Sequence, residues 1–128
     1  MDKRNHRERF DAGLKTRREV LGAKWVDQAM AGVDDFNREF TELLNTYCWN
    51  DIWNRPNLPR KMRSVLNLGM LCALNREHEL KLHIRGALTN GLTKDEIKEI
   101  FLQVAIYCGV PAAVVAFRAA KEVFQSEK

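Results

Sequence analysis

Three side chains that together can bind an anion and move a proton lie close together in this sequence. Arg76, Glu79 and His83 follow one another at spacings of three and four residues. Because an α-helix turns by about 100° per residue, this spacing places all three on one helix face. Such a group can hold an acidic substrate and transfer a proton, or it can be a solvated stripe of ion pairs. Arg85 lies about 200° from His83 and is expected to point elsewhere.

The helix that would carry these residues has clear start and stop signals. Asn75 is predicted to cap its N-terminus, and Asn90-Gly91 supplies the left-handed stop. One apolar stripe runs along it, formed by Leu80, Ile84, Ala87 and Leu88. A capping box at Thr93 and Glu96 then predicts the start of the next helix, which ends at Gly109. A last helix follows, with Pro111 in its first turn.

Two further segments precede this helix. Apolar residues at helical spacing predict a core-facing helix over 34–48 with Asp34 as its N-cap; they are Phe36, Phe40, Leu43, Leu44 and Tyr47. Prolines and tryptophans then predict a loop of about ten residues that contains Trp49, Trp53 and Arg55. From Leu58 to Leu74 the chain is apolar on most sides, which predicts a central helix surrounded by others.

Length and composition fit one all-α domain of about six helices. The chain has 128 residues, of which 45% are apolar and 30% charged, and strand patterns are almost absent. We therefore expect a single domain over 1–128, in which 1–20 is a basic helical segment. An apolar run long enough for a membrane span or signal peptide is not seen, so a cytoplasmic protein without membrane partners is expected.

Charge and cysteine content exclude several classes of function. Residues 1–20 hold seven basic and four acidic side chains, an excess too small to predict a nucleic-acid partner. Cys48, Cys72 and Cys108 form no CxxC pair, so we expect buried reduced thiols and no metal site. Motifs for phosphate-binding loops and metal hydrolases are missing, and no cofactor is expected.

The apolar character of residues 62–74 and 104–117 exceeds what one small bundle can bury. Runs such as Val104–Tyr107 and Val110–Phe117 are therefore candidates for a subunit interface, where each buried apolar side chain contributes roughly 1.5–3 kcal/mol. A homo-oligomer is expected.

Several strings in the sequence resemble the carboxymuconolactone decarboxylase family. They are HxRxALxNG at 83–91, QVAxYxGVPAA at 103–113, and the stretches 47–56, 60–64 and 73–80. The resemblance covers roughly residues 20–125. It implies an all-helical fold related to alkylhydroperoxidase D, a trimer or hexamer, and a role in bacterial aromatic catabolism by the β-ketoadipate route.

The peroxidase signature of the related group is missing its thiols here. If His83 takes the place of the histidine in that signature, Arg76 and Glu79 stand where the two cysteines would be, and Ser64 falls near its glutamate. Peroxide reduction needs a nucleophilic thiolate and a resolving thiol, so this activity is excluded. The coincidence favours the Arg76, Glu79 and His83 face as an active site with different chemistry.

The resemblance implies decarboxylation of 4-carboxymuconolactone to the β-ketoadipate enol-lactone without a cofactor. His83 is our candidate proton donor, held protonated by Glu79, and Arg76 would bind a carboxylate of the dicarboxylate lactone. Further candidates for substrate binding are Arg85, Arg63, Arg55, Trp49, Trp53 and Ser64. For the tryptophans, packing into the core is an equal alternative. A non-catalytic or small-acid-binding relative on the same scaffold also remains open.

Overall fold

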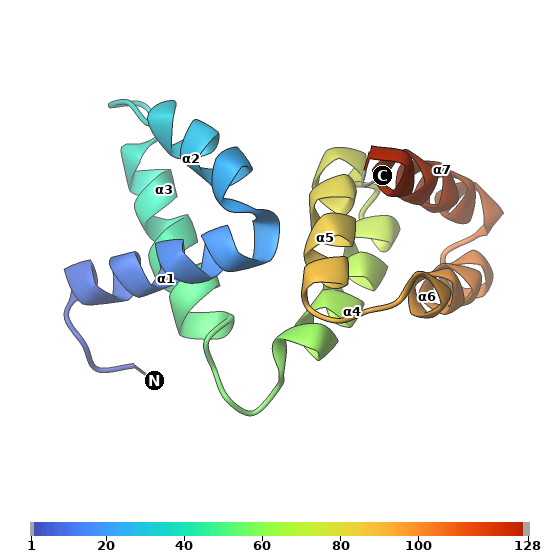
Figure 1. Ribbon diagram of the computed structural model, residues 1–128, viewed down its shortest axis with the longest axis horizontal. Coiled ribbons are helices and arrows are strands. Elements are labelled where there is room, and N and C mark those ends of the chain that lie inside the picture. The colour runs from blue at the N-terminus through green and yellow to red at the C-terminus, as the bar shows by residue number, and fades with distance from the viewer. Residues whose placement is uncertain (1, 127–128) are drawn as a thin grey trace. The chain divides into compact units, whose positions relative to one another are not determined.

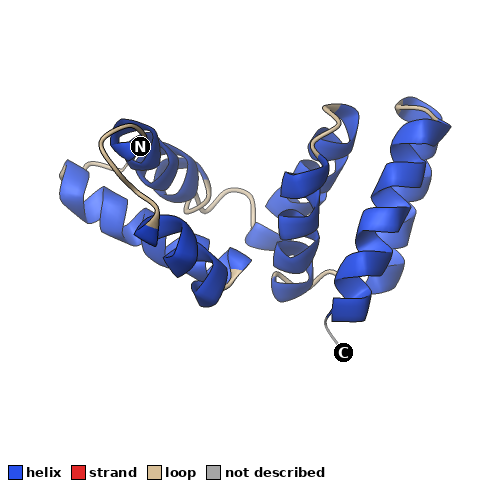
Figure 2. Cartoon of the chain, turned by 90° about the horizontal axis from the view of Figure 1, so that it is seen from above, coloured by secondary structure: helices blue, strands red, loops and turns tan. Residues whose placement is uncertain are grey.

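The predicted all-α class is confirmed by a computed structural model, which describes residues 2–126. Within this range the chain forms seven α-helices, one π-helical segment and no strand (Figures 1 and 2). The elements are α1 (His6–Leu21), α2 (Ala23–Ala31), α3 (Arg38–Leu43), the π-helix η1 (Leu44–Ile52), α4 (Arg60–Ala73), α5 (Glu77–Thr89), α6 (Lys94–Tyr107) and α7 (Val110–Ser126). Over the same residues, the helices are too short or too polar to cross a bilayer.

The chain divides into two compact units, Met1–Pro59 and Arg60–Lys128. In the first, α1 packs against η1 and α2, and α3 continues directly into η1. In the second, α4 contacts α5, α6 and α7, while α7 also packs against α5 and α6. Each unit is described by itself below.

The interior of the first unit is unusually polar. The side of α3 and η1 that faces inward carries Thr41, Asn45, Thr46, Asn50 and Asp51, all buried. The side chains of α1 bond to two of them and to the neighbouring Asn54. Arg17 Nη1 donates to Asn45 Oδ1 over 3.2 Å, Thr16 Oγ1 donates to Asn54 Oδ1 over 2.8 Å, and Arg9 pairs with Asp51.

The prediction that the apolar side of residues 34–48 faces the core is therefore wrong. Phe36, Phe40, Leu43 and Tyr47 are exposed, Phe36 to 92%. The polar side faces α1 instead, because the arginines and the threonine of α1 offer partners for buried amides and carboxylates. Apolar periodicity cannot detect such a polar interior, and it leaves an apolar stripe on the surface of this unit.

The boundaries of this region also differ from the prediction. The helix begins at Arg38, and the Asp34 carboxylate accepts from the backbone N–H groups of Phe36 and Asn37 in the preceding turn. The prediction of a loop that begins at Trp49 is wrong, because η1 continues to Ile52. A π-helical stretch accepts the extra residue per turn while keeping the backbone hydrogen-bonded.

Helix α1 and η1 approach each other closely at Gly13. A Cβ atom on this residue would lie 1.7 Å from the backbone oxygen of Asn45. Glycine is therefore required here for steric reasons, which explains a glycine in the middle of a 16-residue helix despite its cost in helix propensity.

The second unit has a conventional apolar core. It joins α4, α5, α6 and α7 through Leu68, Ile84, Phe101, Ala116 and Val123. The prediction that α4 is surrounded by other helices is wrong. One of its sides carries an exposed apolar stripe of Met62, Leu66 and Met70, which Leu74 extends just beyond the helix end. Helix α4 therefore packs against other helices of its unit on one face, and its opposite face is exposed.

The helix ends of the second unit match the sequence signals in most cases. Thr93 Oγ1 accepts from the Glu96 N–H over 3.0 Å, and Glu96 Oε1 accepts from the Thr93 N–H over 2.9 Å, which confirms the capping box. Gly91 and Gly109 both adopt positive φ angles, as expected of helix terminators. Pro111 lies in the first turn of α7.

Asn75 has a different role from the one predicted. Its φ is 61°, so it ends α4 in the left-handed conformation and does not cap α5. The Asn75 N–H donates to the Cys72 carbonyl over 3.2 Å and the Arg76 N–H to the Leu71 carbonyl over 2.9 Å. This is a Schellman motif, which closes α4 and fixes the path of the chain into α5.

Candidate active site

Helix α5 carries Glu79 and His83 one turn apart, but Arg76 lies outside it. Arg76 is the N-cap residue, with φ −105° and ψ 76°, and its side chain is exposed. The prediction that all three share one helix face is therefore wrong for Arg76, because its N–H still belongs to the Schellman motif and α5 begins only at Glu77. Glu79 and His83 keep the predicted relationship, and any role of Arg76 stays a proposal.

His83 lies against α4 in a partly buried position. Its Nδ1 atom is 3.4 Å from the side-chain Nδ2 of Asn67. Two residues further along α5, Arg85 is also partly buried, and on α4 Arg63 stands four residues before Asn67 with the same degree of burial. The seam between α4 and α5 thus brings the imidazole together with a neutral amide.

Burial controls the protonation of His83. It lowers the pKa of the imidazole to about 4, and the negative charge of Glu79 only partly opposes this. The expectation that Glu79 keeps His83 protonated is therefore wrong for the protein without substrate, because Glu79 is exposed and solvent weakens its field. At neutral pH the ring is uncharged.

A second polar contact links the same two helices. Ser64 is completely buried, and its hydroxyl oxygen accepts from Asn90 Nδ2 over 2.9 Å. This contact joins the first half of α4 to the end of α5. Ser64 therefore acts as an anchor between helices, and a substrate role for it remains a proposal.

The other candidates lie in the first unit. Trp49 and Trp53 stack with ring centroids 4.8 Å apart and are almost fully buried, so packing accounts for both. Arg55 is exposed and lines a polar cavity of about 410 Å³. The other residues of that cavity are Asp2, Arg4, Asn50, Asp51, Asn54, Pro56 and Asn57.

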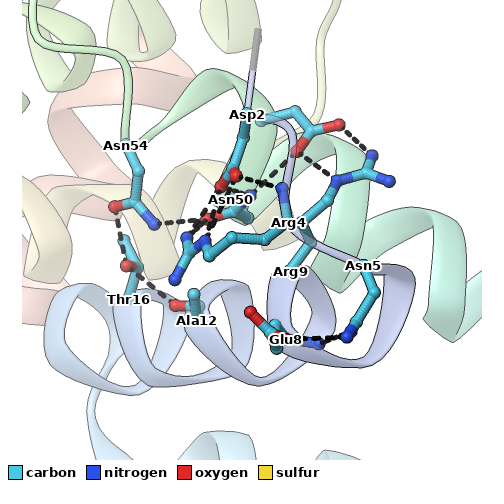
Figure 3. Close-up of polar contacts among 10 residues, drawn as sticks. Asp2, Arg4, Asn5, Glu8, Arg9, Ala12, Thr16, Asn50 and Asn54 are labelled. Carbon is cyan, nitrogen blue, oxygen red and sulfur yellow. Dashed lines mark hydrogen bonds and ion pairs between the residues drawn. The ribbon is translucent and has the colours of Figure 1, made fainter.

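The wall of this cavity is a closed hydrogen-bond network centred on Asn50 (Figure 3). Asn50 Nδ2 donates to Asp2 and Asp51 over 3.0 and 2.8 Å, and its Oδ1 accepts from Arg4 and Asn54 over 3.3 and 3.0 Å. Arg9 completes it by pairing with Asp51, which lowers the pKa of that carboxyl group. All four hydrogen-bonding positions of the Asn50 amide are in use, so this network holds the N-terminal segment on η1.

The cysteines are free thiols in three different environments. Cys72 is buried and Cys48 partly buried, and burial raises the pKa of both, that of Cys72 to about 11. Both therefore stay protonated at neutral pH. Cys108 is exposed, so the prediction of burial is wrong for it. It lies at the end of α6, where the helix leaves the core.

Helices α4 and α6 enclose a groove of about 350 Å³ that contains none of the predicted site residues. Its lining is mostly apolar and consists of Val65, Leu66, Gly69, Met70, Ile100, Gln103, Val104, Tyr107 and Cys108. The lining includes part of the exposed stripe of α4 and the exposed end of α6. An apolar surface of this kind suits protein contact better than binding of a small acid.

Residues 38–122 match the model of the carboxymuconolactone decarboxylase family, and the chain belongs to that family. It is 42% identical over 121 residues to a 4-carboxymuconolactone decarboxylase of Acinetobacter baylyi, which covers 94% of this chain and 90% of the relative. It is 43% identical over 111 residues to the nitrosuccinic acid decarboxylase npaB of Metarhizium robertsii, covering 87% of this chain and 78% of the relative. A 4-carboxymuconolactone decarboxylase of Pseudomonas putida is 38% identical over 47 residues, which are 37% of this chain and 98% of that relative.

Asn67 is the residue of this site that sequence reasoning missed. It is the one polar side chain in the apolar stretch 65–72, and that isolation was a usable signal. A polar residue inside an apolar helix face requires a partner, and His83 provides one.

Proposed function

We propose that this decarboxylase acts on 4-carboxymuconolactone and releases CO2 to form the enol-lactone of β-ketoadipate. The observation that carries the proposal is the 42% identity to a 4-carboxymuconolactone decarboxylase over 94% of the chain. The partly buried imidazole of His83, one helical turn from Glu79, supports it as a group that can move a proton.

The substrate provides its own electron sink. When the C–C bond to the departing carboxylate breaks, the electron pair flows through the ring double bond to the carbonyl oxygen of the lactone and forms a dienolate. One proton added at the carbon next to the carbonyl then gives the enol-lactone. The protein has to hold a dianion, stabilise the developing negative oxygen and deliver that proton.

His83 delivers the proton after the substrate has bound. Its pKa of about 4 in the free protein keeps the ring neutral at pH 7. An opposite charge within about 4–6 Å typically raises such a pKa by about 1–3, and the substrate brings two carboxylates. The ring therefore gains a proton from solvent when the dianion binds and passes it to carbon when CO2 has left.

The arginines are the proposed carboxylate-binding groups. Arg76 projects from the N-cap of α5, where the unpaired backbone N–H groups of the helix end also favour an anion. Arg63 and Arg85, partly buried on α4 and α5, can neutralise the second carboxylate, and Arg55 is a candidate from the first unit. A homo-oligomer is part of this proposal, with the apolar helices around 104–117 as its interface.

A second candidate substrate is nitrosuccinic acid, because a relative with that activity is 43% identical over 87% of the chain. In this acid a nitro group takes the electron pair in place of the lactone carbonyl, and the same proton delivery completes the reaction. The two acids therefore require the same groups from the protein and differ in the shape of the substrate.

The test is to incubate the purified protein with each acid and to measure CO2 release. We expect turnover of 4-carboxymuconolactone with the enol-lactone as product, and a kcat/KM for nitrosuccinic acid at least about tenfold lower. The reverse preference would assign the second substrate. Binding of either acid without CO2 release would favour the alternative of a non-catalytic, acid-binding protein.

A further inference from the structure

The seam between α4 and α5 fixes the position of Asn67 relative to His83. The Schellman motif at Asn75 sets the turn between the helices, and the Ser64–Asn90 hydrogen bond joins them toward their other ends. Between these two anchors Asn67 Nδ2 lies 3.4 Å from His83 Nδ1. The amide and the ring therefore face each other from two helices whose register is fixed at both ends.

The chemistry of this contact selects one form of the imidazole. An amide –NH2 group can only donate, so a ring nitrogen that faces it must accept and carries no proton. In the neutral ring the proton then lies on Nε2. We propose that Asn67 is a positioning residue for His83: by binding Nδ1 it fixes the ring and leaves Nε2 as the nitrogen that exchanges a proton with the substrate. This proposal rests on the proposed function.

The same amide can serve both protonation states of the ring. When the imidazolium forms, Nδ1 also carries a proton and needs an acceptor, which a half-turn of the Asn67 amide supplies through Oδ1. A leucine at this position can serve neither state. An aspartate can only accept, and its charge would favour the imidazolium.

Other charged groups lie on α5 and on the helices packed against it. On α5 itself, the charge of Glu79 acts on His83, and Arg85 is partly buried two residues further along. On α4, Arg63 stands one turn from Asn67. On α7, Glu122 pairs with Lys81 at 2.6 Å, and Arg118 lies 3.8 Å from Glu77. These groups are the same in the variants below, so changes can be assigned to position 67.

Nitrogen NMR of protein labelled with ¹⁵N-histidine tests the positioning without substrate. His83→Gln identifies the signals of His83 by their loss. At pH 7 we expect the Nε2–H form in the unsubstituted protein and a mixture of both neutral forms in Asn67→Leu. In Asn67→Asp we expect a protonated Nδ1, because a carboxylate can only accept. Gln125→Leu also replaces an amide side chain by leucine, at an exposed position on α7, and should leave the spectrum of His83 unchanged. An unchanged His83 spectrum in both Asn67 variants would overturn the proposal.

Kinetics test whether the positioning matters for turnover. We expect Asn67→Leu to lower kcat by about tenfold or more with KM changed less than about threefold, because a misplaced proton donor affects the transition state more than binding. In Asn67→Asp the fall of kcat at high pH should move upward by about 1 pH unit or more. Wild-type kcat in Asn67→Leu, or an unshifted pH profile in Asn67→Asp, would contradict the proposal.

The two tests separate this inference from the proposed function. If the unsubstituted protein decarboxylates neither acid, the proposed function is wrong, and the NMR spectra still decide whether Asn67 fixes the ring. If Asn67→Leu does not fold, the near-isosteric Asn67→Asp decides through the protonation state of His83 and the pH profile. If the unsubstituted protein turns over its substrate and the His83 tautomer is unchanged in both Asn67 variants, the proposed function is supported and the positioning role of Asn67 is wrong.

Discussion

The uncharged state of His83 changes how this residue can act. A proton donor that is neutral in the free enzyme must take up its proton together with the substrate, so binding and protonation are coupled. The negative charge that raises its pKa is then the charge of the carboxylate that leaves as CO2. The exposed Glu79 contributes little until solvent is displaced from it.

The lowered pKa of His83 also predicts how stability depends on pH. The unfolded chain takes up a proton on this residue near pH 6.5, whereas the native ring does so only near pH 4. Stability from this residue is therefore present above pH 6.5 and is lost as the pH falls from 6.5 toward 4. We expect a loss of about 2 kcal/mol between pH 7 and pH 5.

Urea unfolding at the two pH values, at fixed protein concentration, measures this loss. His83→Gln should lose about 2 kcal/mol less than the unsubstituted protein over this range. His78→Gln, which changes an exposed histidine on the same helix, should behave like the unsubstituted protein. Equal pH dependence in His83→Gln would show that His83 is not held neutral by the fold.

Single residues illustrate what the sequence can reveal about the site. Glu79 and His83 were found from their spacing because both lie in a regular helix. The position of Arg76 was missed because Asn75 ends α4 in the left-handed conformation, so that α5 begins one residue later than predicted. Asparagine suits both an N-cap and such a turn. Asn67 was missed because its partner is contributed by another helix.

At the scale of the elements, the close contact between α1 and η1 yields a further prediction. Gly13→Ala would place a methyl group 1.7 Å from the Asn45 carbonyl oxygen, so the two helices must separate. We expect a destabilisation of at least about 3 kcal/mol, at the upper end for overpacked interiors. Thermal unfolding followed by circular dichroism measures it.

Gly69→Ala is the matched control, because it lies in α4 with nothing within 4 Å of the added methyl group. Relief of the poor helix propensity of glycine should stabilise α4 by about 0.5–1 kcal/mol. If Gly13→Ala were tolerated as well as Gly69→Ala, α1 and η1 would not pack as described.

Helix signals in the sequence worked where they are local. The capping box at Thr93 and the glycine stop at Gly91 depend on neighbouring residues only, and both were placed correctly. The inward face of residues 38–52 was predicted wrongly, because it depends on which partners α1 offers to Asn45 and Asp51. Periodicity identifies the apolar face of a helix but cannot tell whether that face meets its own chain or another surface.

At the scale of the whole molecule, the exposed apolar side chains predict self-association. Ile106 is 80% and Tyr107 82% exposed, with Val110 and Val114 following on α7. Stripes of this kind are uncommon on monomers. We expect sedimentation at micromolar concentration to give a particle heavier than the 14.8 kDa chain.

A charge at the centre of this surface should break the assembly. Ile106→Glu is expected to reduce the particle to the monomer, because a buried unpaired carboxylate is costly. Gln125→Glu introduces the same group at an exposed position of α7 outside the apolar surface and should leave the size unchanged. A monomeric unsubstituted protein would remove the interface at residues 104–117 from the account.

The role of His83 as the proton donor is tested by the kcat of His83→Gln with 4-carboxymuconolactone. Glutamine keeps a hydrogen-bonding side chain but cannot donate a proton at neutral pH, and general acid catalysis typically contributes about 10²–10⁴-fold. We therefore predict that kcat falls by about that factor while the helical circular dichroism and the particle size stay unchanged. A kcat close to that of the unsubstituted protein would contradict the account and assign proton delivery to another group.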